Sequence, residues 1–483
     1  MKHKSLGRYA LGISILCMTM IFASCREETK QPNIVVFLCD DLGYGDLSCF
    51  GHPIIKTPNL DKMASAGIKL TSCYSSAPVC SPSRVGLLTG RSPNRAGVYD
   101  WIPEARNETD DLRDLVHMQK NEITIPSILK SVGYTTCLVG KWHCNSKFNS
   151  VDQPQPGDFG FDHWLATQNN ASPSHENPNN FVRNGEPVGQ MTGYSCQLIV
   201  DEAIEWLNKK KDSSPFYLQV TFHEPHEPVA SPPALVQKYL PESISEDQAQ
   251  YFANVANVDK AVGRLIKVLE EKGLDNTLVV FTSDNGPETL DRYRTANRSH
   301  GRPGKLKGMK LWTHEAGFRV PGIIYWTGKS KFSGVVDEPV SALDFLPTFC
   351  ELAGTEIPER NLDGTSFVPL LNGKDFDRKK PLLWCYYNAL NEHMVAMRDG
   401  EWKIMARLKN DTSYIPKAQN IYKGNESLIR SAELVDYSLY NLIDDLSETR
   451  DVSQANPEIF EALKASIKDK YGELIRDTYV WER

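Results

Sequence analysis

The chain has 483 residues, 40% of them hydrophobic and 24% charged, which excludes a disordered, collagen-like or coiled-coil protein. Its formal net charge of -7 gives no global attraction for nucleic acid, so any anionic ligand must be held by a local cationic pocket. Eleven cysteines are too few for a disulfide scaffold in so long a chain, and we expect those in apolar runs to be buried free thiols.

The first 25 residues (1–25) are predicted to be a lipoprotein signal peptide rather than part of the fold. A basic start precedes the apolar run 11–23, which has the length of a secretory core and is too short to span a bilayer. Small residues directly before Cys25 resemble a bacterial lipobox, with Phe22 where leucine is usual; a plain secretory peptide is the alternative. We expect an exported protein in the periplasm or on the cell surface, held to a membrane only by a lipid on Cys25, with 26–31 as a tether.

The following part of the chain alternates apolar strands with amphipathic helices. Buried strands are expected at 34–38, 134–139, 216–222 and 278–282, and helices at 58–66, 124–132 and 252–272. This alternation predicts a mainly parallel sheet covered by helices on both faces. The segment 151–195, rich in Gln, Asn, Pro and Gly, is predicted to be a long loop region.

The composition changes near residue 376. Short antiparallel strands are expected at 401–404 and 438–442, with a turn at 398–400, and an amphipathic helix is expected to begin at Asn456. The sequence therefore predicts a large α/β domain over 32–375 and a smaller C-terminal α+β subdomain with an antiparallel sheet over 376–483.

Polar side chains gather directly after the predicted strands of the large sheet. They are Asp40 and Asp41, Lys141 and His143, His223 and His226, and Asp284 and Asn285. In open parallel sheets, ligands bind beyond the carboxyl ends of the strands, so we expect these residues to share one site. Carboxylate and amide oxygens are hard ligands that favour Ca²⁺ or Mg²⁺. Taken singly, each residue could equally be a turn residue, a cap or a surface charge.

A separate candidate is Cys80. Ser81 and Pro82 are predicted to be the N-cap and first residue of a helix, which places Cys80 at a helix N-terminus and Arg84 about one turn further on. That position favours an anion and would depress a thiol pKa. On these facts alone a structural cysteine is the alternative.

The segment 80–91, CSPSRVGLLTGR, resembles the signature of type I sulfatases at every fixed position. Other landmarks of that family follow the order of this chain and cover nearly all of its mature part: Asp40 and Asp41, GKWH at 140–143, Pro225 and His226, Asp284 and Asn285, and KLWTHEAGFRVP at 310–321. The chain departs from the family pattern at Cys144 and Asn145, where Leu-Gly is usual, and at Ala316, where glycine is usual.

The resemblance implies an alkaline-phosphatase-like fold and a sulfuric ester hydrolase whose cysteine, Cys80, is oxidised to formylglycine by a maturase. It also implies roles for the matching residues. Asp40, Asp41, Asp284 and Asn285, with the modified Cys80, would bind a Ca²⁺ ion, Mg²⁺ being the alternative. Arg84, Lys141, His226 and Lys310 would neutralise the sulfate, His226 or Lys310 would protonate the leaving alcohol, and His143 would act as a base. Asp259, outside this set, is expected to cap or orient a neighbour.

The substrate implied is a sulfated glycan, with galactose or N-acetylgalactosamine sulfate favoured. Asn297, His300 and Arg302 precede Lys310 and are candidates for reading the sugar, with a surface loop as the alternative. Two other functions stay open: a phosphomonoesterase or phosphodiesterase of the same superfamily, and a non-catalytic lipoprotein that binds sulfated glycans.

Overall fold

The computed structural model describes residues 31–105, 111–289, 292, 296–328 and 332–482. From Gln31 onward the chain forms one compact unit. The predicted signal peptide and the lipid site at Cys25 lie outside the described residues. Within the described residues, no helix combines the length and the apolar character that crossing a membrane requires.

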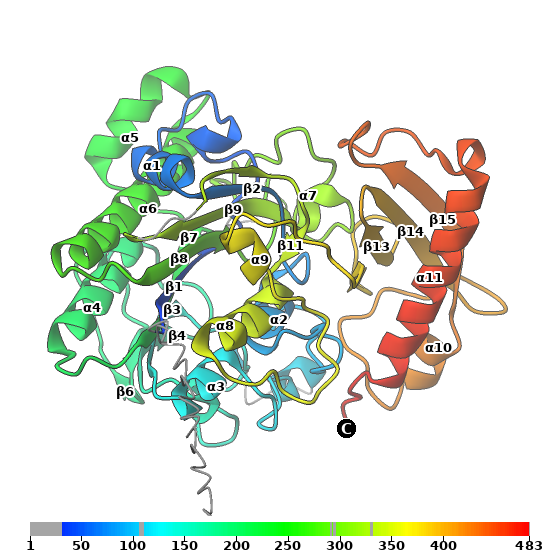
Figure 1. Cartoon of the computed structure of the whole chain (residues 1–483), viewed down its shortest axis with the longest axis horizontal. Helices are drawn as coiled ribbons and strands as arrows, with labels where there is room; N and C mark the ends of the chain where they lie inside the picture. Colours follow the sequence, from blue (N-terminus) through cyan, green and yellow to red (C-terminus); the bar gives the residue numbers. More distant parts are fainter. Residues whose placement is uncertain (1–30, 106–110, 290–291, 293–295, 329–331, 483) are drawn as a thin grey trace, which may run out of the picture. The chain divides into compact units, whose positions relative to one another are not determined.

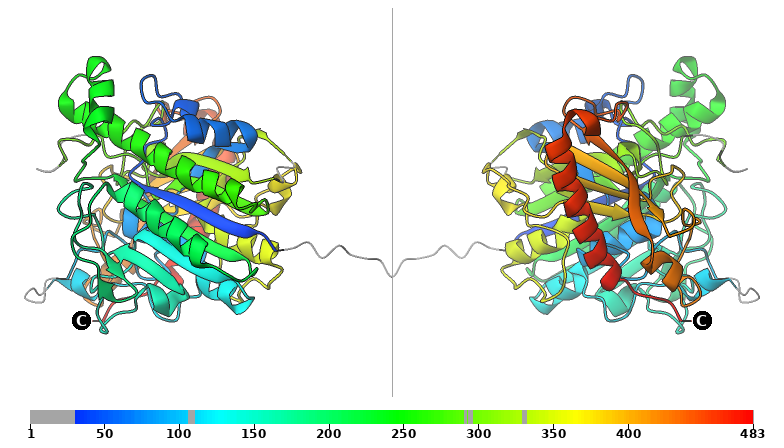
Figure 2. Two further views of the ribbon diagram at one scale, coloured as in Figure 1. Left: turned by 90° about the vertical axis from the view of Figure 1, so that its left-hand side faces the viewer. Right: turned by 90° about the vertical axis from the view of Figure 1, so that its right-hand side faces the viewer.

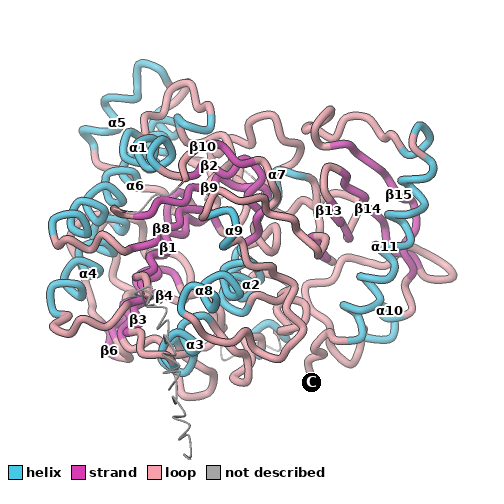
Figure 3. The backbone as a smooth tube through the Cα atoms, in the orientation of Figure 1, coloured by secondary structure: helices cyan, strands magenta, loops and turns pink. Residues whose placement is uncertain are grey.

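A large mixed sheet forms the centre of this unit (Figures 1 and 3). The strands run in the order β10-β2-β9-β8-β1-β7-β3-β4-β5-β6, with β11 paired to β2. The five neighbours β8, β1, β7, β3 and β4 are all parallel, whereas β9 and β5 are antiparallel to the strands beside them. The bounds are β1 Asn33–Asp40, β2 Ile68–Tyr74, β3 Thr135–Lys141, β4 His163–Thr167, β5 Val182–Arg183, β6 Glu186–Pro187, β7 Phe216–Pro225, β8 Thr277–Ser283, β9 Arg319–Trp326, β10 Gly334–Val336 and β11 Val340–Ser341.

Helices cover both faces of this sheet, and Figure 2 (left) shows the green helices α4 and α6 lying over one of them. One face carries α1 Pro58–Ala66, α4 Ser195–Lys209, α5 Pro233–Tyr239 and α6 Glu246–Glu271, and the other carries α2 Cys80–Thr89, α3 Ile125–Ser131 and α8 Phe345–Ala353. Because successive side chains of a strand point to opposite faces, Val35 and Phe37 pack in the first layer and Val36 and Leu38 in the second. The short helices α7 Glu315–Phe318 and α9 Val368–Leu371 lie in connections.

The predicted strands and helices of the large sheet are confirmed, with two corrections. The segment 151–195 is not only loop, because it contains β4, β5 and β6, which extend the sheet at its edge. These strands have two to five residues, too short for periodicity to reveal. The helix predicted to begin at 252 begins at Glu246, where the Ser245 side chain accepts a hydrogen bond from the backbone N–H of Gln248.

A second, antiparallel sheet lies in the C-terminal part, with the order β12-β13-β14-β15. Its strands are β12 Leu382–Cys385, β13 Val395–Asp399, β14 Trp402–Lys409 and β15 Glu433–Asn441; the helices of this part are α10 Glu426–Arg430 and α11 Pro457–Arg476. The predicted turn is confirmed, with Gly400 at φ 56° between β13 and β14. The boundary at residue 376 stays a prediction.

A buried ionic cluster joins the two sheets. Lys403 of β14 lies 3.1 Å from Oε1 of Glu315 and 2.8 Å from Oε1 of Glu448, and all three side chains are fully buried. Beside them, the rings of Phe318 and Trp384 stack with centroids 4.0 Å apart. The Lys403–Glu315 pair and the stacked rings tie the segment after Lys310 to the C-terminal sheet.

Nine described cysteines are free thiols, in agreement with the prediction: Cys39, Cys49, Cys73, Cys80, Cys137, Cys144, Cys196, Cys350 and Cys385. Eight of them are buried. They therefore contribute to the core as small apolar side chains.

Candidate active site

The candidate site lies where four neighbouring parallel strands end. Asp40 is the last residue of β1 and Lys141 the last of β3, while His226 follows β7 and Asp284 follows β8. Since β8, β1, β7 and β3 are adjacent in the sheet, their carboxyl ends bring these side chains together, as predicted. The N-terminus of α2 adds Cys80 to the same place.

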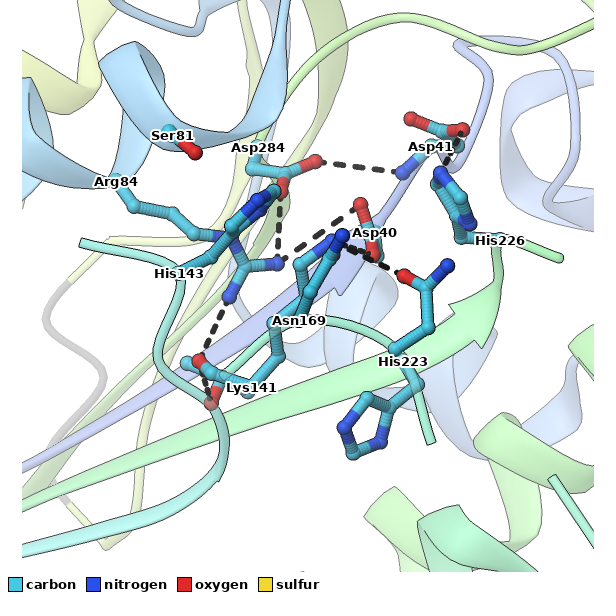
Figure 4. Close-up of polar contacts among 12 residues, drawn as sticks. Asp40, Asp41, Ser81, Arg84, Lys141, His143, Asn169, His223, His226 and Asp284 are labelled. Atoms are coloured by element: carbon cyan, nitrogen blue, oxygen red, sulfur yellow. Dashed lines mark hydrogen bonds and ion pairs between the residues drawn. The ribbon is translucent and has the colours of Figure 1, made fainter. Parts of the chain in front are cut away.

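Arg84 connects three of these chain segments (Figure 4). Its Nε donates to Oδ2 of Asp284 at 2.8 Å, and its Nη2 lies 2.7 Å from the same oxygen. Its Nη1 donates to the carbonyl oxygen of Lys141 at 2.9 Å. The guanidinium is only 2% exposed, so these partners offset the cost of burying its charge.

Lys141 reaches the end of β1. Its Nζ donates to Oδ2 of Asp40 at 2.5 Å and to Oδ1 of Asn170 at 3.5 Å. Burial alone would raise the pKa of Asp40, but Lys141, together with His226 and Arg84, holds that pKa well below its usual value. Asp40 is therefore an anion inside a cationic pocket.

The backbone of Asp41 has a left-handed conformation, with φ 64°, which turns its carboxylate back into the site. Its Oδ2 accepts from Nζ of Lys310 at 2.8 Å and lies 3.5 Å from Nε2 of His226. Its Oδ1 accepts from the amide of Asn285 at 2.7 Å, and its N–H donates to Oδ1 of Asp284 at 3.3 Å.

The oxygens of the site fit a divalent cation. Ligand atoms of Asp40, Asp41, Cys80 and His226 lie within 4.8 Å of one another. Oδ1 of Asp40 and Oδ1 of Asn285 are buried and accept no hydrogen bond from the described residues. A hard cation would satisfy both oxygens.

Asp284 supports the same fit. Burial and the nearby charge of Asp40 raise the pKa of Asp284 to about 7, although Arg84 opposes the shift. A cation between the two carboxylates would remove their repulsion. Of the predicted ligands, Asp40 and Asp41 have carboxylate oxygens within 4.8 Å of the Cys80 sulfur. The Asp284 carboxylate instead pairs with Arg84. His226, which was not a predicted ligand, belongs to the same cluster.

The environment of Cys80 corrects one prediction. Burial raises the pKa of its thiol to about 12, although Lys141 and Lys310 oppose the shift. The expected depression by the helix N-terminus is therefore wrong, because desolvation of the thiolate outweighs the dipole. An unmodified Cys80 is a neutral thiol and a poor nucleophile at neutral pH.

The start of α2 differs from the prediction as well. The helix begins at Cys80 itself, and Val79, which makes no side-chain cap, is the residue before it. Ser81 does not cap the helix, because its Oγ accepts a hydrogen bond from the backbone N–H of Ile102 at 3.0 Å. The cysteine remains in the first turn, whose backbone N–H groups have no carbonyl partner within the helix.

His143 is held in one orientation. Its Nε2 lies 2.9 Å from the carbonyl oxygen of Ile102, which fixes the proton on that nitrogen. Its Nδ1 is buried and finds no partner among the described residues. Burial, with Lys141 and Arg84 nearby, holds the pKa of His143 well below its ordinary value, so the ring is neutral.

A cavity of about 480 Å³ opens beside these groups. Its lining comprises Val79, Cys80, Trp101, His143, Asn169, Asn170, Pro173, His226, Glu227, Pro228, Arg292, Lys310 and Leu311. Asn297, His300 and Arg302, the candidates for reading a sugar, are not among these residues. The backbone N–H of Arg302 instead donates to Oδ1 of Asp46, which ties that loop to the segment after β1.

Two polar residues singled out from the sequence have structural roles. His223 follows the predicted strand but lies within β7 and is turned away from the cavity, with Thr167 Oγ1 and Ser195 Oγ each 2.7 Å from a ring nitrogen. Asp259 accepts from the backbone N–H groups of Asn59 and Leu60, so it caps α1 as expected. Trp101 lines the cavity, but the sequence did not indicate a role for it at the site. It lies in a loop whose sequence has no hydrophobic periodicity that would mark its position.

Comparison with known proteins gives one family. A model described as "Sulfatase" matches residues 32–355, and one described as "N-sulphoglucosamine sulphohydrolase, C-terminal" matches 309–415. The N-acetylgalactosamine-6-sulfatase of Rattus norvegicus is 34% identical over 77% of this chain and 71% of its own length. Arylsulfatase A of Homo sapiens is 30% identical over 92% of this chain and 89% of its own length.

Solved structures agree. The structure of Ps i-CgsB in complex with k-i-k-neocarrahexaose has a TM-score of 0.73 and 27% identity, and covers 93% of this chain and 94% of its own. A phosphonate monoester hydrolase of Agrobacterium radiobacter, 19% identical with a TM-score of 0.57 over 92% of this chain and 95% of its own, shares the fold alone. The predicted alkaline-phosphatase-like α/β fold is thus confirmed.

Proposed function

Because the chain belongs to the sulfatase family of sulfuric ester hydrolases, we propose that it removes O-sulfate from galactose or N-acetylgalactosamine units of a glycan. The observation that carries the proposal is the placement of Cys80, the cysteine of a complete family signature, at a cavity beside the cationic side chains of Arg84, Lys141 and Lys310. Relatives named for a carbohydrate sulfate and a solved neighbour that holds a neocarrahexaose support hydrolysis of sulfate esters on glycans; the sugar is our inference.

We propose that Cys80 is converted to formylglycine and that Asp40, Asp41, Asp284 and Asn285 hold a Ca²⁺ ion beside it, with Mg²⁺ as the alternative. The hydrated aldehyde supplies the nucleophilic oxygen and the second hydroxyl needed to release sulfate, and the cation supplies Lewis acidity. The raised pKa of the unmodified thiol supports this assignment, because a neutral thiol would attack a sulfate ester poorly.

The remaining groups neutralise and orient the sulfate. Arg84, Lys141 and Lys310 bring three cationic side chains to one place, and their positions are fixed by Asp284, Asp40 and Asp41. Preorganised charges of this kind stabilise the transition state without reorganisation during the reaction. The site therefore favours a compact anionic head group such as sulfate.

Two residues can serve the leaving alcohol. The Nδ1 of His226 lies 2.7 Å from the carbonyl oxygen of Glu227, which leaves Nε2 facing the cavity. Burial, together with the charge of Lys310, lowers the pKa of His226, so that its free nitrogen accepts rather than donates a proton. We therefore assign the proton of the leaving alcohol to Lys310, and His226 would hold the sulfate only in its protonated form, in which Nε2 carries an N–H.

His143 has the features of the base. Its Nε2–H is engaged by Ile102, and Nδ1 keeps a lone pair beside Cys80. A neutral imidazole of low pKa can remove a proton throughout the neutral range. We assign to it the proton whose removal accompanies release of sulfate.

The proposed sugar rests on the relatives. One is named for N-acetylgalactosamine 6-sulfate, and a solved neighbour holds a neocarrahexaose. The test is a panel of galactose, N-acetylgalactosamine and glucosamine sulfates, with release of sulfate measured for each and an aryl phosphate as comparison. Turnover of a galacto-configured sulfate above the others is expected; faster cleavage of the phosphate would favour the phosphoesterase function, and binding without turnover of any sulfate would favour a non-catalytic lectin.

We also propose export and attachment by a lipid on Cys25, on the pattern of residues 1–25 alone. Formylglycine formation requires a maturase that acts on cysteine, so activity in a foreign host would depend on that enzyme. Cys25→Ala is expected to release the protein from the membrane fraction with unchanged turnover. A wild-type protein found wholly in the soluble fraction would contradict the lipid anchor and leave only a secretory signal.

A further inference from the structure

The cavity is larger than a sulfate group needs. Its volume is about 480 Å³, whereas one water molecule occupies about 30 Å³ in the liquid. A group of five heavy atoms such as sulfate therefore leaves much of the cavity unfilled. Cys80, His143, His226 and Lys310 account for the polar floor. The remaining lining combines apolar and polar side chains, which suits a sugar ring with its hydroxyl groups: Val79, Trp101, Pro173, Pro228 and Leu311 are apolar, and Asn169, Asn170, Glu227 and Arg292 are polar or charged.

Trp101 is the largest side chain in this remaining lining and is 37% exposed. A large exposed aromatic surface is costly in water, and it commonly marks a ligand contact when it borders a cavity. The guanidinium of Arg113 lies 5.1 Å from the centroid of its ring. The indole thus contacts a cation and also lines the cavity.

The backbone at Trp101 is held rigidly. The buried carboxylate of Asp100 accepts from the N–H of Trp101 at 2.9 Å, from the hydroxyl of Tyr386 at 2.9 Å and from the amide of Asn388 at 2.8 Å. Tyr386 also packs against Cys80 in a small buried cluster. The indole is thus presented from a fixed support rather than from a loose loop.

The next residue, Ile102, links this support to the catalytic groups. Its N–H donates to Oγ of Ser81, the neighbour of Cys80, and its carbonyl oxygen accepts from Nε2 of His143 and from the amide of Gln168. The position of the indole relative to Cys80 is therefore fixed by the hydrogen bonds that the N–H and the carbonyl oxygen of Ile102 make. A platform fixed in this way can position a substrate.

We propose that the indole of Trp101 is the surface on which the pyranose ring next to the sulfate stacks; the inference rests on the proposed function. The face of an indole is electronegative, so it repels the sulfate and attracts the C–H bonds of a sugar. A galacto-configured ring has an axial O4, which leaves the hydrogens of C3, C4 and C5 on one continuous face. Asn169, whose Oδ1 is buried and accepts no described hydrogen bond, offers an acceptor for a hydroxyl at the same cavity.

The test is steady-state kinetics of Trp101→Ala and Trp101→Phe on the best sulfated saccharide of the parent enzyme. Loss of an aromatic anchor is expected to raise KM about tenfold or more, while kcat stays within about threefold, because the cationic floor is intact. The phenylalanine variant should recover most of the loss. In a Cys80→Ala background, calorimetric binding of the same saccharide should weaken by the same factor.

Two controls separate stacking from general damage. Inhibition by inorganic sulfate, which occupies only the cationic floor, should be unchanged in Trp101→Ala. Tyr414→Ala removes another exposed aromatic ring with an arginine above it, 3.6 Å away in that case, and should leave KM unchanged.

An unchanged KM in Trp101→Ala, or an equal loss of sulfate and saccharide affinity, would overturn the inference. Both results require an active parent enzyme. If the parent desulfates no saccharide, it is the proposed function that fails.

Discussion

His143→Asn isolates the proposed base with little damage to the fold. The position has φ 57°, a conformation that asparagine adopts more readily than alanine does. The substitution removes the hydrogen bond to the carbonyl oxygen of Ile102, but that oxygen keeps a donor in the amide of Gln168 at 3.2 Å. We therefore expect a stability loss of only about 1–2 kcal/mol.

The catalytic loss should be much larger. Removing a positioned base commonly costs about 10²–10⁴-fold in rate, or roughly 3–5 kcal/mol of activation free energy at 1.36 kcal/mol per factor of ten. Because His143 does not hold the sulfate in our scheme, kcat should fall while KM changes little. The assay is sulfate release at saturating saccharide, together with urea unfolding of both proteins.

The pH dependence of stability gives a second readout. The pKa of His143 lies well below its unfolded value of about 6.5, so its contribution to stability is present above pH 6.5 and is lost as the pH falls towards the folded pKa. Asparagine does not titrate, so the stability difference between parent and variant should shrink at pH 5 relative to pH 8. His52→Asn, at a buried histidine outside the cavity lining, serves as the control and should lower stability without lowering kcat. Unchanged kcat in His143→Asn, or a rise in KM alone, would refute the role of base.

Two further predictions concern the cation and the junction between the sheets. Folding raises the pKa of Asp284 from about 4 to about 7, so ionisation of this carboxyl lowers the stability of the metal-depleted protein as the pH rises from about 4 to about 7. Added Ca²⁺ should therefore raise Tm more at pH 8 than at pH 5. This difference between the two pH values should be absent in Asp284→Ala. An equal rise at both pH values would contradict the assignment. Lys403→Met leaves the buried carboxylate of Glu448 without its lysine, while Glu315 keeps its ion pair with Arg319, and should cost about 3–5 kcal/mol in urea unfolding. Lys470→Met, at an exposed pair with Glu473, should cost less than about 1 kcal/mol. Similar losses in the two variants would show that the buried cluster does not stabilise the junction.

The site could be predicted because its chemistry is encoded locally. Asp40, Lys141 and Asp284 each stand at or directly after a buried parallel strand, and the carboxyl ends of neighbouring strands meet at one edge of a sheet. The family landmarks carried the same residues. Pattern and resemblance therefore agreed on which side chains share the site.

Other features depend on contacts that no local pattern records. The raised pKa of Cys80 follows from burial, which the sequence around it does not reveal. Trp101 is held in place through Asp100, whose carboxylate accepts hydrogen bonds from Tyr386 and Asn388, nearly three hundred residues away along the chain. The strands β4 to β6 are too short to show a period, and Ser81, which has the residue type of an N-cap, bonds to Ile102 instead.

The measurement that tests the central claim most directly is mass spectrometry of the peptide containing Cys80 from an active preparation. The assignment of Cys80 as the precursor of the nucleophile predicts the mass of formylglycine in place of cysteine, with an aldehyde-reactive probe labelling the same peptide. It also predicts that specific activity rises in proportion to the modified fraction. Full activity in a preparation that carries only the Cys80 thiol would contradict the account.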